Sequence, residues 1–170
     1  MKKNMNFVVP NGYVGYSNMT KRVYTEGQWI NPFTVMLIDI RCPELVDKDQ
    51  TVSCYKTREN AENTVEYRVK YTYKEDIKIG FCRSGINADI LNNWIKTQIR
   101  YNKDMYLSEV SFGEVAQTQE NIRNTENHIS EELKKYLESK ISESITENFP
   151  FLDIDFTITN ISVKRPASWS

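Results

Sequence analysis

With 170 residues, 39% of them hydrophobic and 26% charged, the chain is long enough to bury a core, and we expect it to form one domain, 1–170. Its net charge of -1 lacks the basic excess of nucleic-acid-binding proteins, so no nucleic-acid partner is expected. The three cysteines, Cys42, Cys54 and Cys82, include no CxxC pair, which argues against a disulfide framework and favours a reducing, cytoplasmic compartment.

The N-terminus shows neither a signal peptide nor a membrane span. Lys2 and Lys3 precede an apolar run of only Phe7, Val8 and Val9, which is too short for the apolar region of a signal peptide. No window approaches the roughly 20 apolar residues that cross a bilayer. Any membrane contact is therefore expected to be peripheral.

The first half, about 1–75, is rich in strand signals. Pro10, Asn11 and Gly12 predict a turn or bulge inside FVVPNGYVGYS, and Glu26 with Gly27 predicts a second turn before the breaker Pro32. The segment TVMLIDIRC then places alternate apolar residues on one face: Met36, Ile38 and Ile40.

The clearest strand is TVEYRVKYTYK, because apolar and polar residues alternate along its whole length. Its apolar face is formed by Val65, Tyr67, Val69, Tyr71 and Tyr73. The preceding QTVSCYKT, separated from it by the polar loop RENAEN, is expected to pair with it as an antiparallel hairpin.

Two helices and a closing strand are predicted in the second half, about 76–170. Asn87 is a candidate N-cap for a helix from Ala88 to Tyr101, followed by the linker DMYLSEVS. A longer amphipathic helix is predicted from Ser111 to Phe149, with Ser111 and Glu114 as a capping box and Pro150 as its stop. Its apolar stripe is Ile122, Ile129, Leu133, Tyr136, Leu137, Ile141, Ile145 and Phe149.

The last segment, DIDFTITNISVKRP, reads as a terminal strand. Ile154, Phe156 and Ile158 alternate, and the apolar phase then slips at Asn160, which predicts a bulge or a strand end there. The chain is thus expected to have an α+β fold.

The order of these elements resembles the SPFH, or band 7, domain of stomatins, prohibitins and flotillins. The resemblance rests on the opening VVPNGYVGYS, the EGQWINPF turn, the IDIR strand, the hairpin leading to VEYRVKYTY, the two helices and the closing LDIDFTITNISVKRP. Family members typically have a Pro-Gly where this chain has Glu26 and Gly27. They usually carry a membrane anchor and a coiled coil, and neither is expected within these 170 residues. The resemblance implies an N-terminal antiparallel sheet lobe, an α/β lobe, and a long helix followed by a strand.

The resemblance also implies a function. The leading hypothesis is a non-enzymatic, prohibitin-like or stomatin-like scaffold, without cofactors, that self-associates or docks on membrane-associated partners. A homo-oligomer or a partner of the same family is expected. The alternative is a soluble decoy or regulator that binds a membrane-bound AAA protease or its prohibitin-like partner.

Residues suited to catalysis or metal binding are scarce in the sequence. His128, the single histidine, is expected to be a solvated helix residue, since one imidazole rarely works without an orienting partner. Asp153 and Asp155 flank Ile154 on what is expected to be the wet face of a strand. A second alternative, a single-stranded nucleic-acid-binding module, would use the tyrosines of VEYRVKYTY, but the neighbouring basic residues are expected to lie on the opposite face.

One group of apolar residues is a candidate membrane or partner contact: Phe7, Val8, Val9, Trp29, Ile30 and Phe33. These residues would gather at one pole of the domain if the opening strands pair, and in the SPFH family that pole faces the membrane. Trp suits a membrane interface, and Lys2, Lys3, Lys21 and Arg22 would attract anionic lipids. The alternative is that the same side chains close the end of the sheet.

Overall fold

A computed structural model describes residues 7–56, 58–74, 86–110 and 118–164 of the chain. It confirms a mixed α+β fold with two antiparallel sheets and two helices. The small sheet has the order β2-β1-β3 and consists of β1 (Tyr13–Tyr16), β2 (Val23–Tyr24) and β3 (Met36–Asp39). The large sheet has the order β4-β5-β6 and consists of β4 (Leu45–Cys54), β5 (Asn60–Tyr73) and β6 (Leu152–Val163).

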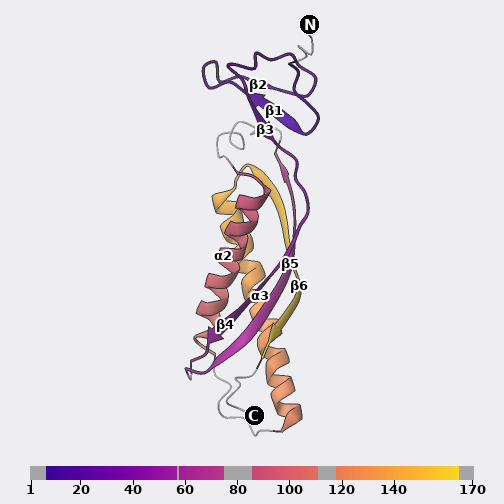
Figure 1. Cartoon of the computed structure of the whole chain (residues 1–170). Helices are drawn as coiled ribbons and strands as arrows, with labels where there is room; N and C mark the ends of the chain where they lie inside the picture. Colours follow the sequence, from indigo (N-terminus) through magenta and orange to yellow (C-terminus); the bar gives the residue numbers. More distant parts are fainter. Residues whose placement is uncertain (1–6, 57, 75–85, 111–117, 165–170) are drawn as a thin grey trace.

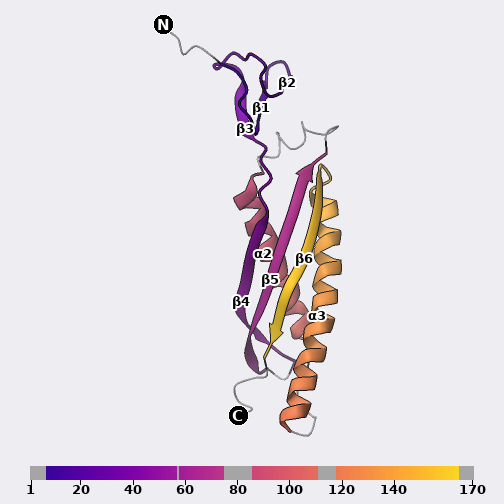
Figure 2. The ribbon, with the colours of Figure 1, turned by 90° about the vertical axis from the view of Figure 1, so that its right-hand side faces the viewer.

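The large sheet forms a two-layer body with the two helices, α2 (Ala88–Leu107) and α3 (Gln119–Asn148). Both helices cover the same face of this sheet, and the small sheet stands beyond one end of the body (Figures 1 and 2). Along the chain, the small sheet ends with β3 and the large sheet begins with β4. β5 pairs with both β4 and the closing strand β6, so β4 belongs to the large sheet.

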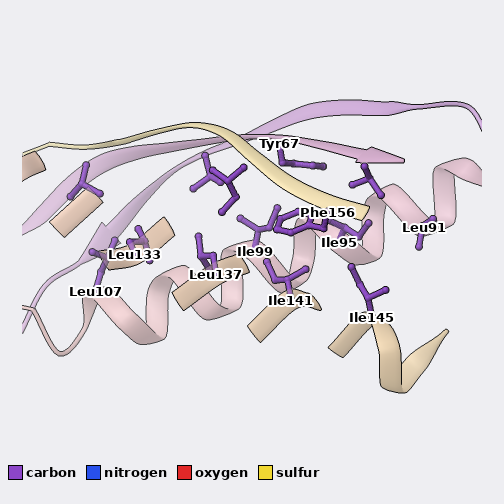
Figure 3. Packing of buried hydrophobic residues seen from close by; sticks show 14 of the residues in the cluster. Tyr67, Leu91, Ile95, Ile99, Leu107, Leu133, Leu137, Ile141, Ile145 and Phe156 are labelled. Carbon is purple, nitrogen blue, oxygen red and sulfur yellow. The ribbon is translucent and has the colours of Figure 1, made fainter. Parts of the chain in front are cut away.

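The main core lies between the helices and the inner face of the large sheet (Figure 3). The predicted alternation of β5 is confirmed, because Val65, Tyr67 and Val69 are fully buried there. The stripe predicted for the long helix is also confirmed, with Leu133, Leu137 and Ile141 at its centre. Phe149 closes one end of the core and meets the ring of Trp94 on α2 edge-on, at 4.8 Å between centroids.

The helix boundaries differ from the predictions in two places. Asn87 caps α2 as predicted by accepting a hydrogen bond from Ile90 N, but the helix continues past Tyr101 to Leu107. The predicted start of the long helix at Ser111 lies outside the described residues. Thr118 has an extended backbone, and its side chain accepts from Asn121 N, so α3 begins directly after it. The stop before Pro150 is confirmed, since α3 ends at Asn148.

The strands also extend beyond their predicted limits. β4 begins at Leu45, opposite Val69, and β5 begins at Asn60, so the hairpin loop is shorter than the predicted RENAEN segment. The predicted bulge is confirmed, because Asn160 pairs with Glu66 while Ile158 pairs with the next residue, Tyr67. The extra residue lies in β6 and restores the apolar phase, so that Val163 is buried.

The apolar face predicted for β3 is only partly buried. Ile38 and Ile40 pack against a small core formed by Val14 and Tyr16 of β1. Met36 lies opposite Tyr16 at the end of the strand pair and is exposed. The short strands of the small sheet leave little apolar area to cover it.

Within the described ranges, neither helix has a stretch apolar enough to cross a lipid bilayer.

Candidate functional site

Pairing between two segments of the small-sheet region brings together five of the predicted contact residues: Phe7, Val8, Val9, Trp29 and Ile30. Val8 and Trp29 form an antiparallel bridge, flanked by hydrogen bonds from Ile30 N to Phe7 O at 2.8 Å and from Val9 N to Gln28 O at 3.0 Å. Gly27 makes the preceding turn possible with its φ of +83°, a conformation that glycine adopts without strain. The turn predicted at Glu26 and Gly27 is therefore present.

The six residues differ in exposure. Val9 is 1% exposed and belongs to the interior of the small-sheet region. This agrees with the alternative in which such side chains close the end of the sheet. Val8 and Ile30 are half-buried. Trp29 is 67% exposed, Phe33 is 94% exposed and Phe7 is 37% exposed. Trp29 and Phe33 therefore present exposed aromatic side chains in the small-sheet region.

Further exposed apolar residues lie elsewhere in the small-sheet region. Met19 lies in the turn between β1 and β2, while Met36 and Leu37 lie on β3, and all three are exposed. We call the six exposed residues Phe7, Met19, Trp29, Phe33, Met36 and Leu37 the apolar lobe surface. Sequence reasoning missed Met19, because a methionine in a polar turn shows no periodicity.

Two basic residues of the small-sheet region, Lys21 and Arg22, lie in the same connection between β1 and β2 as Met19. Lys21 adopts a left-handed backbone with φ of 59°, and its N-H donates to Ser17 O at 2.8 Å. Arg22 stacks over the ring of Tyr24 at 5.1 Å from the ring centroid. Both residues are exposed and therefore add positive charge to the lobe. The other two basic residues of the prediction, Lys2 and Lys3, lie outside the described residues.

A second polar constellation, missed by sequence reasoning, lies between β4 and α2. Lys103 and Asp49 are both fully buried, and Lys103 Nζ donates to Asp49 Oδ2 at 2.7 Å and to Thr51 Oγ1 at 2.6 Å. Arg100 donates to the other carboxylate oxygen, Asp49 Oδ1, through Nη2 at 3.0 Å. Asp49 is thus held by two cations from one helix.

The polar contacts between β4 and α2 continue along the strand at Asp47. Asn92 Nδ2 donates to Asp47 Oδ2 at 2.9 Å, and Tyr67 donates its hydroxyl hydrogen to Asn92 Oδ1 at 2.8 Å. Lys96 Nζ reaches the same carboxylate oxygen at 3.5 Å. Because every one of these groups has a partner, the polar contacts between β4 and α2 fix the position of the helix on the sheet. We therefore assign them a structural role.

Three aspartates, Asp39, Asp47 and Asp49, have lowered pKa values in the folded chain. Hydrogen bonds from Arg41 lower the pKa of Asp39 to about 2, and a hydrogen bond from Asn92 is the main cause that lowers the pKa of Asp47. For Asp49, burial alone would raise the pKa, but the hydrogen bonds and charges of Lys103 and Arg100 outweigh it and lower the pKa.

We therefore expect the free energy of unfolding to decrease as the pH falls from about 4, the ordinary value for aspartate, toward 2. The carboxylates have lower pKa values in the folded chain, so the unfolded chain binds protons first. Urea unfolding followed at pH 5, 4, 3 and 2 measures this, and Asp47→Asn should make the decrease shallower. A free energy that is unchanged or rises over this range would contradict the assignment.

The other residues weighed for chemistry are solvated. His128, Asp153 and Asp155 are exposed, in line with their predicted places on a wet helix face and a wet strand face. Cys54 is exposed as well. Cys82 lies outside the described residues. Among the residues that the structure describes, no group of three or more histidine, cysteine, aspartate or glutamate side chains is placed to hold a metal ion.

Comparison of the sequence with protein-family models gives no match, and a search of curated proteins gives none either.

Proposed function

We propose that this chain is a non-enzymatic scaffold domain of SPFH or band 7 type, which self-associates and docks on an anionic membrane surface through its small sheet. The observation that carries the proposal is the apolar lobe surface, where Trp29 is 67% and Phe33 is 94% exposed. Exposed aromatic side chains of this size are costly in water unless another surface covers them.

Two further features support docking on lipid. Trp has an apolar ring with one polar N-H, which suits the boundary between lipid headgroups and acyl chains. Lys21 and Arg22 are exposed in the same lobe, and each basic residue close to an anionic leaflet contributes roughly 1 kcal/mol of attraction. The element order, a small sheet followed by a hairpin, two helices and a closing strand, is compatible with the family to which the resemblance points.

The test is light scattering of the purified chain combined with co-sedimentation on vesicles of phosphatidylcholine and phosphatidylserine. We expect an assembly larger than a monomer and quantitative vesicle binding. Replacing Trp29 and Phe33 together with serine should weaken vesicle binding at least about tenfold, because two aromatic side chains no longer leave water on docking. Binding should also weaken as salt is raised.

Tyr101→Ser is the matched control, since Tyr101 is also an exposed aromatic residue but lies on α2, away from the small sheet. It should bind vesicles like the unaltered chain. A monomer that ignores vesicles, or equal loss in both variants, would refute the proposal and direct attention to a soluble protein partner.

A further inference from the structure

In the described part of the chain, β4 and β6 are the two edge strands of the large sheet. The side chains that lie along these two edges differ. On β4 the inward-facing positions carry Asp47 and Asp49, and inward-pointing charges of this kind discourage a further strand from adding to an edge. On β6, side chains of α3 contact the edge: Ile158 N donates to Glu138 Oε2 at 3.4 Å and Val163 N to Ser130 Oγ at 3.3 Å. Between these two points, no side chain among the described residues hydrogen-bonds to the edge of β6.

A groove of about 610 Å³ opens there, between residues 159–164, at the end of β6 and just beyond it, and the first half of α3. Ile161 lies two residues before Val163, and the register between them is unbroken. The N-H of Ile161 therefore points away from β5, to the same side as the N-H of Val163. An extended chain lying in the groove can therefore reach backbone hydrogen-bonding groups of β6 and side chains of α3 together.

The charged side chains that line the groove indicate which kind of peptide it would bind. Three exposed cations line it, Arg123, Lys134 and Lys164, and within the described part of the chain none of the three forms an ion pair. Two acids, Glu126 and Glu131, also line it, which leaves an excess of positive charge. Arg123 and Lys134 are separated by three turns of α3, and this spacing places them on one stripe of the helix.

We propose that this groove binds an acidic peptide segment of a partner protein in extended conformation, added as a strand to the edge of β6. Backbone hydrogen bonds to Ile161 supply a site for any extended chain, and the cations of α3 and Lys164 favour one rich in carboxylates. The start of α3 and the end of β6, whose residues line the groove, lie toward the end of the body opposite to the small sheet, so this proposal is independent of membrane docking (Figure 1).

The probe is a short, fluorescently labelled peptide of alternating glutamate and valine with blocked ends, and its binding to the full chain is followed by fluorescence anisotropy. We expect saturable binding that weakens with salt, and no binding of the same peptide with lysine in place of glutamate. Lys134→Glu should lower the affinity at least about tenfold, because a favourable charge becomes a repulsive one.

Lys135→Glu is the matched control: it changes the net charge equally and lies one residue away, but it faces Glu132 and does not line the groove. It should bind like the unaltered chain. A peptide methylated on alternate backbone nitrogens should lose binding, and the amide NMR signal of Ile161 should shift only with the unmethylated peptide. No binding of the acidic peptide, equal loss in both charge variants, or unchanged binding after methylation would each overturn the proposal.

Discussion

Replacing Asp49 with alanine is expected to lower the free energy of unfolding by about 3–5 kcal/mol, more than any surface substitution in this chain. The variant leaves the ammonium group of Lys103 fully buried, with only the hydroxyl of Thr51 beside it. Arg100 is half-exposed and regains water, so the cost comes from Lys103. Urea unfolding of the variant and of the unaltered chain, at the same pH, gives the difference.

The double variant Asp49→Leu with Lys103→Met separates the penalty of a lone charge from the value of the pair. Replacing both partners with apolar residues of similar volume removes the desolvation cost of each, and stability should return close to that of the unaltered chain or exceed it. Lys96→Met serves as the control at the half-exposed pair with Asp47, where a loss within about 1 kcal/mol is expected. A single Asp49→Ala loss no larger than that of Lys96→Met would show that Lys103 is not held by Asp49.

The buried pair also explains where prediction from the sequence stopped. Strand β5 and the stripe of α3 follow regular apolar periods, so residues such as Val65 and Leu137 could be assigned to the core from the sequence. Strand β4 reverses the usual pattern, because its inner face carries Asp47 and Asp49 while Val46 points outward and is exposed. Such a strand is stabilised by partners on a helix far along the chain, and a local pattern cannot reveal them.

The same reason accounts for the missed end of α2. The apolar pattern fades after Ile99 because Asn102 and Lys103 are polar, yet both are buried against neighbouring elements. A signal was present in the sequence: Lys96, Arg100 and Lys103 recur at steps of four and three, which marks a basic stripe on a helix. Only the tertiary register shows that this stripe faces the acids of β4 rather than water.

The candidate contact surface was predictable in part for a different reason. Large apolar side chains beside turn residues stand out in a sequence, so Trp29 and Phe33 could be singled out. Their exposure could not be predicted, because a turn residue either covers the end of a sheet or projects from it. That choice depends on backbone geometry: Phe33 N donates to Asn31 Oδ1 at 2.9 Å within a local turn, and the Phe33 side chain is left in solvent.

Leu137→Ala is expected to lower the free energy of unfolding by about 2–5 kcal/mol, since Leu137 lies at the centre of the core between α3 and the large sheet (Figure 3). Its side chain is 0% exposed, so the lost carbons leave a cavity that the helices and the sheet can close only partly. Thermal and urea unfolding of the variant measure the loss.

Leu37→Ala provides the matched control, because it removes the same atoms from a residue that is 44% exposed on β3. We expect a loss within about 1 kcal/mol there, since little apolar area returns to water. The contrast has a functional use: Leu37 belongs to the apolar lobe surface, so Leu37→Ala should weaken vesicle binding while Leu137→Ala should leave binding of the folded fraction unchanged. Equal stability losses at the two positions would mean that the small sheet is packed as tightly as the main core, and its exposed side chains would then need another explanation.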